Sequence, residues 1–274
     1  MSASPGSVTV VGCGLAGARH LTLETVETIR AADVVYHLVT GDEAVAAFAA
    51  LNPQTYGLIG FYRDGALDLD VYAQIVSFVI AQALVPRRVV LVVMGHPSIY
   101  VAPTHMLQEH GPRYGVPVSV LPAISSIDVM LTDFPFDIAN TGLQILDANR
   151  LVTYRLRPQR NVPLLLFQVG CFGSGIITRT QQNHPGRLSA LADYLLGFYG
   201  AAHEVVLIEG GMGFPHRPVR HRMPLAELAT NGHLVTYNTT LYVPAEERVA
   251  VRDAEFLARL TDPHAAAELV AAAR

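Results

Sequence analysis

The sequence predicts an α/β protein of two lobes with a short helical extension at the C-terminus. Short β-branched runs alternate with longer segments of helical period, which is typical of parallel strands joined by helices. These runs form two series, and the stretch "YGVPVSVLP" (114–122) separates them. Beyond residue 245, the helical stretches "AEFLARL" and "HAAAELVAAAR" flank the breaker "TDP" (261–263).

The first lobe, residues 1–118, begins with the strand-like run "VTVV" and a glycine-rich turn. Such β-branched runs favour strands. Thr22, with Glu24 close behind it, is typical of a helix N-cap followed by an acid in the first turn. In order, we expect a strand at Val8–Val11, a helix at Thr22–Ala31, a strand at Val34–Leu38, a helix at Asp70–Leu84, and strands at Val89–Met94 and Val118–Leu121.

The second lobe, residues 119–245, shows the same alternation, and residues 246–274 form the helical extension. Its apolar run "LLLF" has the length and flanks of a buried strand. In order, we expect a strand at Leu164–Val169, a helix at Gly186–Phe198, and strands at Val205–Glu209 and Thr239–Val243.

Composition excludes several classes of protein. Of the 274 residues, 51% are hydrophobic and 15% charged, so the chain can bury a sizeable core. A net charge of -4 argues against nucleic acid as the main partner. The N-terminus lacks the features of a signal peptide, and no apolar run is long enough to span a membrane. We therefore expect a cytoplasmic protein without membrane or nucleic-acid partners.

The cysteines and histidines do not predict a metal site. Cys13 and Cys171 are far apart and have no zinc-type spacing, so each is interpreted as a small buried residue. His96 has no second ligand at helical spacing, and His105 and His110 lie five residues apart. We expect no bound metal.

Gly12, Gly14 and Gly17 have the G-x-G-x-x-G spacing of a dinucleotide-binding turn. A dinucleotide site also needs an acid after the second strand, to bind the ribose hydroxyls. Asp33 precedes that strand, and Asp42 lies beyond a further glycine. A tight turn that brings a helix close to the sheet is at least as good an interpretation. A nicotinamide-dependent enzyme stays open as an alternative.

Several motifs in order resemble class III, or tetrapyrrole-methylase-type, S-adenosylmethionine-dependent methyltransferases. They cover about residues 8–244: "VVGCGLAG" with "LTLETVETIRAADVVYHLVT", "MGHPSIYVAPTH" (94–105), "LPAISSIDVML" (121–131), "LLLFQVGCFG" and "LYVP". Within that family the chain is most similar to the borosin peptide-backbone α-N-methyltransferases. That likeness is carried by "LVTGDEAVAAFAALNP", "GHPSIYVAPTH", "LFQVGC" and "GFYRDGALDLDVYAQIV" (60–76).

The resemblance implies the tetrapyrrole methylase fold, in which the cofactor lies in a cleft between two α/β lobes, and a homodimer. S-adenosylmethionine is the implied cofactor and S-adenosylhomocysteine its product. The glycine turn is then expected on the acceptor side of the cleft. Taken singly, a Gly-His-Pro turn and paired serines also suit purely structural roles. The implied cofactor-binding residues are Met94, His96, Ile99, Tyr100, Val101, Ser125, Ser126, Phe167, Gln168, Gly210, Gly211, Thr239 and Thr240.

The resemblance places the catalytic residues at Tyr62, Tyr72 and Asp68. An amide nitrogen is a weak nucleophile, because its lone pair is delocalised into the carbonyl group. Tyr72 is the implied base or proton relay, and Tyr62 orients the amide or stabilises its oxygen. Borosin enzymes usually have arginine at position 68, and tyrosines at the positions of Ile59 and Met94. From the residues, Asp68 is interpreted as a helix-capping acid with Asp70, and Arg63 as a substitute cation.

The implied substrate is a ribosomally made precursor peptide. Since "AAELVAAAR" does not resemble the apolar core of fused borosin enzymes, we expect action in trans on a separate precursor. The basic stretch "HRPVRHR" (216–222) is interpreted as a solvated loop, with binding of an acidic leader or of tetrapyrrole carboxylates as the alternative. Two other functions stay open: methylation of a tetrapyrrole such as a precorrin, and a catalytically impaired peptide-binding member of the family.

Overall fold

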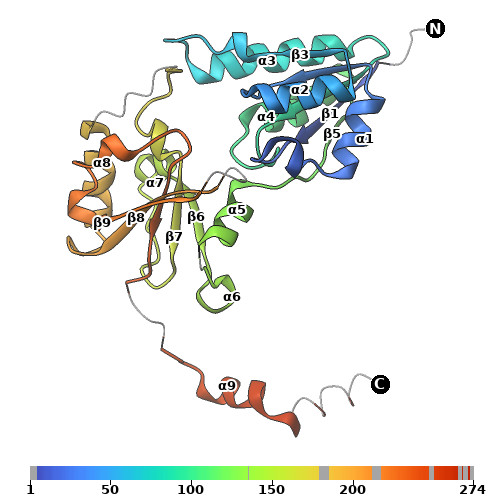
Figure 1. Cartoon of the computed structure of the whole chain (residues 1–274). Helices are drawn as coiled ribbons and strands as arrows, with labels where there is room; N and C mark the ends of the chain where they lie inside the picture. Colours follow the sequence, from blue (N-terminus) through green and yellow to red (C-terminus); the bar gives the residue numbers. More distant parts are fainter. Residues whose placement is uncertain are drawn as a thin grey trace.

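The structure, a computed structural model, describes residues 5–134, 136–178, 185–211, 217–246, 250–264, 267 and 271. Its strands form two five-stranded sheets, each with helices packed on both faces (Figure 1). The predicted fold class is therefore confirmed. Within the described residues, no helix combines the length and the apolar character that a membrane span needs.

The first sheet is entirely parallel and has the strand order β3-β2-β4-β1-β5. Its strands read as continuous apolar runs because both faces of the sheet are covered. Val8 of β1 lies beside Val89 of β4 on one side and Val118 of β5 on the other. The strands are β1 (Ser7–Gly12), β2 (Val34–His37), β3 (Thr55–Gly57), β4 (Arg88–Val93) and β5 (Val118–Val120).

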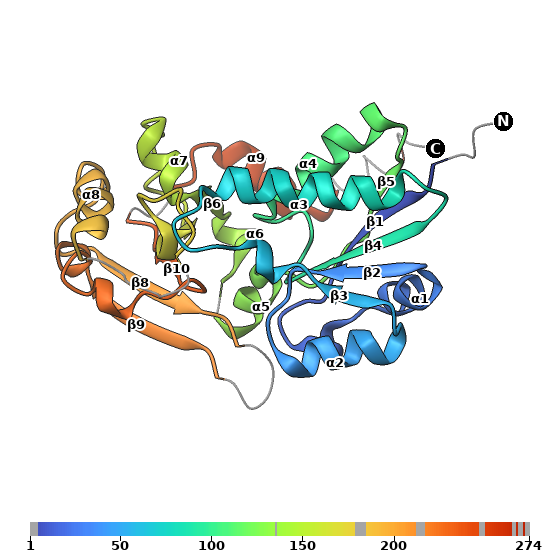
Figure 2. The same cartoon turned by 90° about the horizontal axis from the view of Figure 1, so that it is seen from above.

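Alternate side chains of these strands point to opposite faces and build two separate cores. Val8 and Val10 pack on the face covered by α3 (Asp68–Ala83) and α4 (Ala102–His110). Val11 packs on the other face, which α1 (Leu23–Ala31) and α2 (Asp42–Leu51) cover. The two helix pairs lie on opposite sides of the sheet in Figure 2. Because helices cover both faces of the sheet, the carboxyl ends of its strands are the edge that remains open.

The start of α1 agrees with the sequence prediction, whereas the start of α3 differs from it. Thr22 caps α1 as expected, since its hydroxyl oxygen accepts a hydrogen bond from the Thr25 backbone N–H at 3.1 Å. Helix α3 begins at Asp68, two residues before the predicted start, and Leu67 at its N-cap makes no side-chain cap. The predicted capping role of Asp68 is therefore wrong, although its charge still lies at the positive end of the helix dipole.

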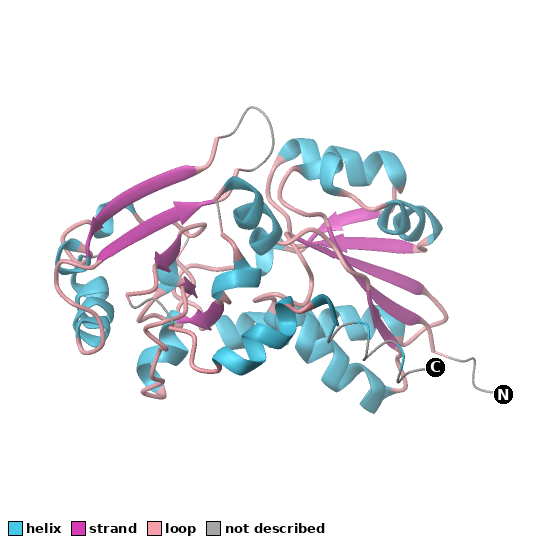
Figure 3. Cartoon of the chain, turned by 90° about the horizontal axis from the view of Figure 1, so that it is seen from below, coloured by secondary structure: helices cyan, strands magenta, loops and turns pink. Residues whose placement is uncertain are grey.

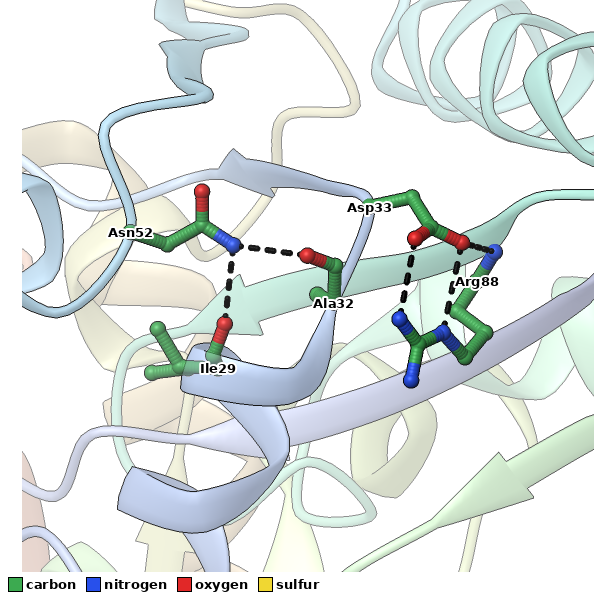
Figure 4. A network of polar contacts seen from close by, with 5 residues as sticks. All are labelled: Ile29, Ala32, Asp33, Asn52 and Arg88. Carbon is green, nitrogen blue, oxygen red and sulfur yellow. Dashed lines mark hydrogen bonds and ion pairs between the residues drawn. The ribbon is translucent and has the colours of Figure 1, made fainter.

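The amino ends of the strands are fixed by polar contacts that run between elements (Figure 4). Asn52 donates from Nδ2 to the carbonyl oxygens of Ile29 and Ala32, which closes the end of α1. Asp33 accepts hydrogen bonds from the Arg88 backbone N–H at 2.7 Å and from its guanidinium at 2.9 Å. The guanidinium and backbone hydrogen bonds from Arg88 lower the pKa of Asp33 to about 2. Asp33 is thus a structural residue at the edge opposite the open one.

The second sheet has the order β6-β7-β10-β8-β9 and is mixed. Only β6 and β7 pair in parallel, so the expectation of parallel strands fails for the other three pairs. Only nine residues separate the end of β8 from the start of β9, and parallel neighbours need a crossover of about a dozen residues or more, so this pair is antiparallel. Figure 3 shows the two sheets as separate groups of strands. The strands are β6 (Gln144–Asp147), β7 (Leu164–Phe167), β8 (Glu204–Glu209), β9 (Val219–Pro224) and β10 (Thr240–Val243).

Helices cover both faces of this sheet as well. Leu151, Leu188 and Leu191 belong to the core on the face of α7 and α8, and Met130 of α5 packs on the other face. Leu164 and Leu165 are fully buried on opposite faces. The helices are α5 (Ser126–Asp133), α6 (Ile138–Thr141), α7 (Ala148–Thr153) and α8 (Pro185–Leu196), and the short 3-10 helices of the chain are η1 (Gly17–His20), η2 (Ile59–Phe61), η3 (Gly111–Tyr114), η4 (Val169–Cys171), η5 (Leu225–Glu227) and η6 (Gly232–Leu234).

The basic stretch belongs mostly to β9 and is not the solvated loop that we expected. Arg222 forms an ion pair with Glu204 on the neighbouring strand at 2.6 Å. Arg220 donates to the Asp133 carbonyl oxygen, and its guanidinium lies 4.4 Å from the centre of the Phe134 ring. These arginines therefore join β9 to its neighbours. His216 lies outside the described residues.

In the extension, α9 (Ala254–Thr261) lies apart from the two lobes (Figure 1). Asp253 caps it by accepting the Phe256 N–H, and the side chains of Phe256 and Leu260 are exposed. Most of "HAAAELVAAAR" lies outside the described residues. The lobe boundaries, the homodimer and the cytoplasmic location stay predictions.

Gly12→Ala should destabilise the fold. A Cβ at position 12 would lie 2.1 Å from the Gly95 carbonyl oxygen and 2.6 Å from Ala123 Cβ, so backbone would have to shift. We expect thermal and denaturant unfolding to show a loss of about 2 kcal/mol or more in the free energy of unfolding. Gly60→Ala is the matched control, because nothing lies within 4 Å of the added Cβ. Equal stability of the two variants would contradict the close approach.

Candidate functional site

One cavity, which we call the strand-end cavity, lies where β4, β7 and β8 end. Its volume is about 220 Å³. Twelve of the thirteen residues predicted to bind the cofactor line it. The exception is Gly211, whose N–H donates to the Asp133 carboxylate at 2.6 Å. The lining residues are Leu15, Met94, Gly95, His96, Ile99, Tyr100, Val101, Ser125, Ser126, Met130, Phe167, Gln168, Gly210, Tyr237, Asn238, Thr239 and Thr240.

The turn after β4 shapes one wall of this cavity. Gly95 has a φ of +70°, which glycine adopts without strain, and its N–H donates to the Gly14 carbonyl oxygen at 3.0 Å. His96 Nδ1 accepts the Ser98 backbone N–H at 3.1 Å. The tight turn and the glycine loop therefore brace each other at the carboxyl ends of β1 and β4.

An aromatic stack joins the two lobes at the cavity. Tyr100 follows β4 and Phe167 ends β7, and their rings lie 4.8 Å apart at an interplanar angle of 16°. Tyr100 and Gln168 also have φ values of 55° and 61°. Among the described residues, only Arg155 is another non-glycine with positive φ. Such backbone strain gathers at functional sites, because the surroundings must enforce it.

The strand-end cavity has no cationic lysine or arginine in its described lining, although the N-terminus of α5 at Ser125 borders it, and this disfavours a phosphate-rich ligand. Among the described residues that line the cavity there is no lysine, arginine or carboxylate. Pyrophosphate is normally bound by a helix N-terminus or by cations. Aromatic and apolar surface with amide and hydroxyl groups instead suits a nucleoside attached to an amino acid, such as S-adenosylmethionine.

Ser125 is occupied by a structural role. Its hydroxyl donates to the Asp128 carboxylate at 2.6 Å and accepts from the Ile127 and Asp128 N–H groups, so it caps α5. The capping interpretation of the paired serines therefore holds for Ser125. Ser126, the first residue of α5, also lines the cavity.

A second cavity, the interlobe cavity, adjoins the first and measures about 1140 Å³. The start of α3 and the segment before it contribute Tyr62, Asp68 and Tyr72, so the three predicted catalytic residues share one lining. The second lobe contributes Asp147, Cys171 and others. The two cavities have in common Ile99, Tyr100, Val101, Gln168 and Tyr237.

A segment of the second lobe, residues 172–178, reaches the first lobe at this cavity, and we call it the crossing segment. The Asp68 N–H donates to the Gly175 carbonyl oxygen at 3.0 Å, and the Ile177 N–H donates to Ala66 at 2.8 Å. The Gly65 N–H completes the pairing by donating to Ile177. Backbone hydrogen bonds thus tie the crossing segment to the start of α3.

Tyr62 and Tyr72 of the interlobe cavity are neutral at physiological pH. Burial, the charge of Asp68 and the nearby Cys171 raise the pKa of Tyr72 to about 12. Burial is also the main cause that raises the pKa of Tyr62, whose ring centre lies 6.3 Å from that of Tyr72. Both phenols therefore act as hydrogen-bond donors. Asp68 Oδ1 is shielded from solvent and has no hydrogen-bond partner in the described structure.

The cation of this cavity differs from the one that we predicted. Arg63 donates to Gln74 on the exposed face of α3 and is absent from the lining. Arg150 of α7 lines the cavity instead, with its guanidinium 4.6 Å from the centre of the Tyr154 ring. No local pattern in the sequence marks Arg150, because it lies in the other lobe and reaches the cavity only through the fold.

Cys13 and the glycine loop line a third cavity, whereas Cys171 lines the interlobe cavity. Cys13 is buried as expected, and Cys171 is half-buried; burial raises the pKa of both thiols to about 11. Gly14 and Gly17 line the third cavity with Asp42, and their position on the acceptor side stays a prediction. Within the described residues, no group of three or more His, Cys, Asp or Glu is placed to hold a metal ion.

Comparison with known families agrees with this geometry. The model of the tetrapyrrole (corrin/porphyrin) methylases matches residues 7–229. The chain belongs to this family. S-adenosylmethionine is the cofactor that this assignment indicates.

The chain is similar to fungal methyltransferases whose names include a peptide precursor. It is 28% identical to a methyltransferase/ribosomally synthesized type I borosin cyclic peptide precursor of Coprinopsis marcescibilis, over 87% of this chain and 62% of the relative. It is 29% identical to the methyltransferase/ribosomally synthesized cyclic peptide omphalotin A precursor of Omphalotus olearius, over 89% and 59%. The chain therefore spans about three fifths of the length of these relatives.

Solved structures share the fold. A uroporphyrin-III C-methyltransferase of Thermus thermophilus matches with a TM-score of 0.60 at 18% identity, over 88% of this chain and 92% of its own. A form of that enzyme complexed with S-adenyl homocysteine matches with a TM-score of 0.57 at 18% identity, over 87% and 97%. At such identity the likeness shows the fold alone.

Asp68→Asn should lower the pKa of Tyr72 below about 12, because a neutral amide no longer opposes the phenolate. The phenolate absorbance of Tyr72, obtained by subtracting the titration of Tyr72→Phe, should therefore appear at lower pH. Asp70→Asn is the matched control, since Asp70 lies in the same helical turn but outside the cavity lining. A titration of Tyr72 that Asp68→Asn leaves unchanged would contradict the assigned charge effect.

Proposed function

We propose that this chain is an S-adenosylmethionine-dependent methyltransferase that N-methylates backbone amides of a ribosomally made peptide. One observation carries the proposal: Tyr62, Asp68 and Tyr72 line a cavity that opens directly beside the strand-end cavity. The size of the interlobe cavity suits an extended peptide segment, and relatives at 28 to 29% identity carry peptide-precursor names. Action in trans on a separate precursor belongs to the proposal as a prediction.

The residues of the chain bind, align and shield the reactants. The bound cofactor supplies a methyl group activated by its sulfonium centre. The stacked Tyr100 and Phe167 form an aromatic wall of the strand-end cavity that would orient the cofactor. An acceptor amide held in the adjoining interlobe cavity would lie beside the cofactor, and this ordering would lower the barrier.

Tyr62, Tyr72 and Asp68 act on the acceptor amide. Neutral Tyr62 donates a hydrogen bond to the amide oxygen, which makes the N–H more acidic. We assign Tyr72 to a proton relay: its oxygen takes the proton from the nitrogen while its own proton passes to the Asp68 carboxylate. The raised pKa of Tyr72 means that its phenol is protonated before the reaction, so Tyr72 suits a proton relay better than a phenolate base. The relay gives the aspartate at position 68 a role that arginine would not fill.

The charge of the cavity favours a peptide over a tetrapyrrole acid. Asp68 and Asp147 both line the cavity, and both charges help to raise the pKa of Cys171. A substrate that carries many carboxylates would meet like charge at this wall. A peptide backbone offers uncharged N–H and C=O groups, and Arg150 at the same cavity suits its carbonyl oxygens.

Co-expression with candidate precursor peptides tests the proposed function. We expect intact mass spectrometry to show a ladder of single methyl additions on one peptide, and fragmentation to place them on backbone nitrogens. Tyr72→Phe should reduce the rate of methylation about 100-fold or more with unchanged cofactor affinity, because the relay is broken. Cofactor binding without any methylated peptide would indicate an impaired peptide-binding protein. Methylation of a precorrin or tight binding of NAD would overturn the proposal.

Arg150→Gln should raise the peptide KM about 10-fold, because one charge-assisted hydrogen bond of about 1.5 kcal/mol is lost. The affinity for S-adenosylmethionine should stay within twofold, since Arg150 is absent from the strand-end lining. Arg157→Gln is the control: Arg157 is an exposed arginine nearby that lines neither cavity. Steady-state kinetics with varied peptide measures both variants, and equal KM values would remove Arg150 from the acceptor site.

A further inference from the structure

Glu209 holds a turn at the rim of the strand-end cavity. It is the last residue of β8, and its Oε1 accepts hydrogen bonds from the hydroxyls of Thr236 and Thr239, both at 2.6 Å. The Thr239 hydroxyl oxygen also accepts the Thr236 backbone N–H at 2.7 Å, and Thr236 Oγ1 accepts the Asn238 N–H at 3.1 Å. Each hydroxyl has one proton and gives it to Glu209, so one carboxylate closes the whole turn.

The turn presents four consecutive residues to the cofactor. Tyr237, Asn238, Thr239 and Thr240 all line the strand-end cavity, whereas Glu209 lines neither cavity. The turn is packed closely from behind: a Cβ at Gly170 would lie 2.2 Å from the Thr236 carbonyl oxygen. Since the turn cannot move toward Gly170, the bonds from Glu209 set how far it projects into the cavity.

Tyr237 links the turn to the interlobe cavity. It lines both cavities, and its hydroxyl bonds with the hydroxyl of Thr178 at 2.5 Å and with the Thr178 carbonyl oxygen. Thr178 ends the crossing segment, which pairs with the start of α3 at Asp68. Hydrogen bonds, linked by short stretches of main chain, therefore connect Glu209 to the wall of the interlobe cavity.

We propose that Glu209 is a positioning residue that couples the two cavities: it fixes the turn 236–239 against the cofactor and, through Tyr237, fixes the crossing segment against the acceptor. The inference rests on the proposed function for its acceptor half. Hydrogen bonds to a carboxylate are stronger than those to a neutral group, which explains why an acid and no amide stands here. Loss of the carboxylate lets both hydroxyls rotate and frees the turn.

The experiment compares Glu209→Ala, Glu209→Gln and Tyr237→Phe. Glu204→Gln is the matched control, because Glu204 lies at the other end of the same strand and pairs only with β9. Calorimetry gives the Kd for S-adenosylmethionine, kinetics give kcat and KM for the peptide, and thermal unfolding gives Tm. For Glu209→Ala we expect both the Kd and the peptide KM to rise about tenfold. Glu209→Gln, which keeps an acceptor oxygen, should bring both the Kd and the peptide KM most of the way back to the wild-type values.

Tyr237→Phe separates the two halves of the coupling. It removes the two hydrogen bonds to Thr178 and keeps the ring that lines the strand-end cavity, so the peptide KM should rise severalfold with a smaller change in the Kd for S-adenosylmethionine than Glu209→Ala gives. A purely structural Glu209 would lower Tm without moving either constant in the folded protein, and that result overturns the inference. So does an unchanged peptide KM in Tyr237→Phe. If the wild type binds S-adenosylmethionine without methylating peptide, the proposed acceptor is wrong, and the Kd of Glu209→Ala alone decides the positioning role.

Discussion

The stack of Tyr100 on Phe167 is the contact on which both cavities depend. One ring follows β4 of the first sheet and the other ends β7 of the second, so the pair fixes the strand ends of the two lobes against each other. Tyr100 and Gln168 adopt positive φ values on either side of this contact. Backbone strain of this kind persists only where the surrounding structure enforces it. The two lobes together supply that enforcement, and neither cavity is complete in one lobe.

Much of the fold follows from local pattern. The valine-rich runs of β1 and β4 and the N-cap at Thr22 carry their own signals, because both faces of a parallel sheet are covered and a cap is a local hydrogen bond. The antiparallel pairing of β7, β10, β8 and β9 carries no such signal. Strand partners far apart in the sequence are chosen by packing, and the basic stretch in β9 looked like a loop for the same reason.

The candidate site shows the same limit. The order of the motifs was sufficient to predict which residues line the strand-end cavity, because these residues directly follow the strands that the motifs mark. Arg150 and Glu209 could not be predicted from the sequence, because each interacts with elements far away in the chain. Arg150 reaches the interlobe cavity from the second lobe, and Glu209 accepts hydrogen bonds from two hydroxyls of a distant turn. Asp68 was identified as important, yet its partnerless buried oxygen is visible only in the structure.

The crossing segment is held to the first lobe by three main-chain hydrogen bonds and by the side chain of Ile177, which packs against the core of that lobe. Main-chain bonds do not depend on the identity of the side chains. Ile176, which lines the interlobe cavity and is about half exposed, is thus released from the packing that joins the lobes. Substrate choice can therefore drift through this position during divergence, or be redesigned there, while the architecture stays intact.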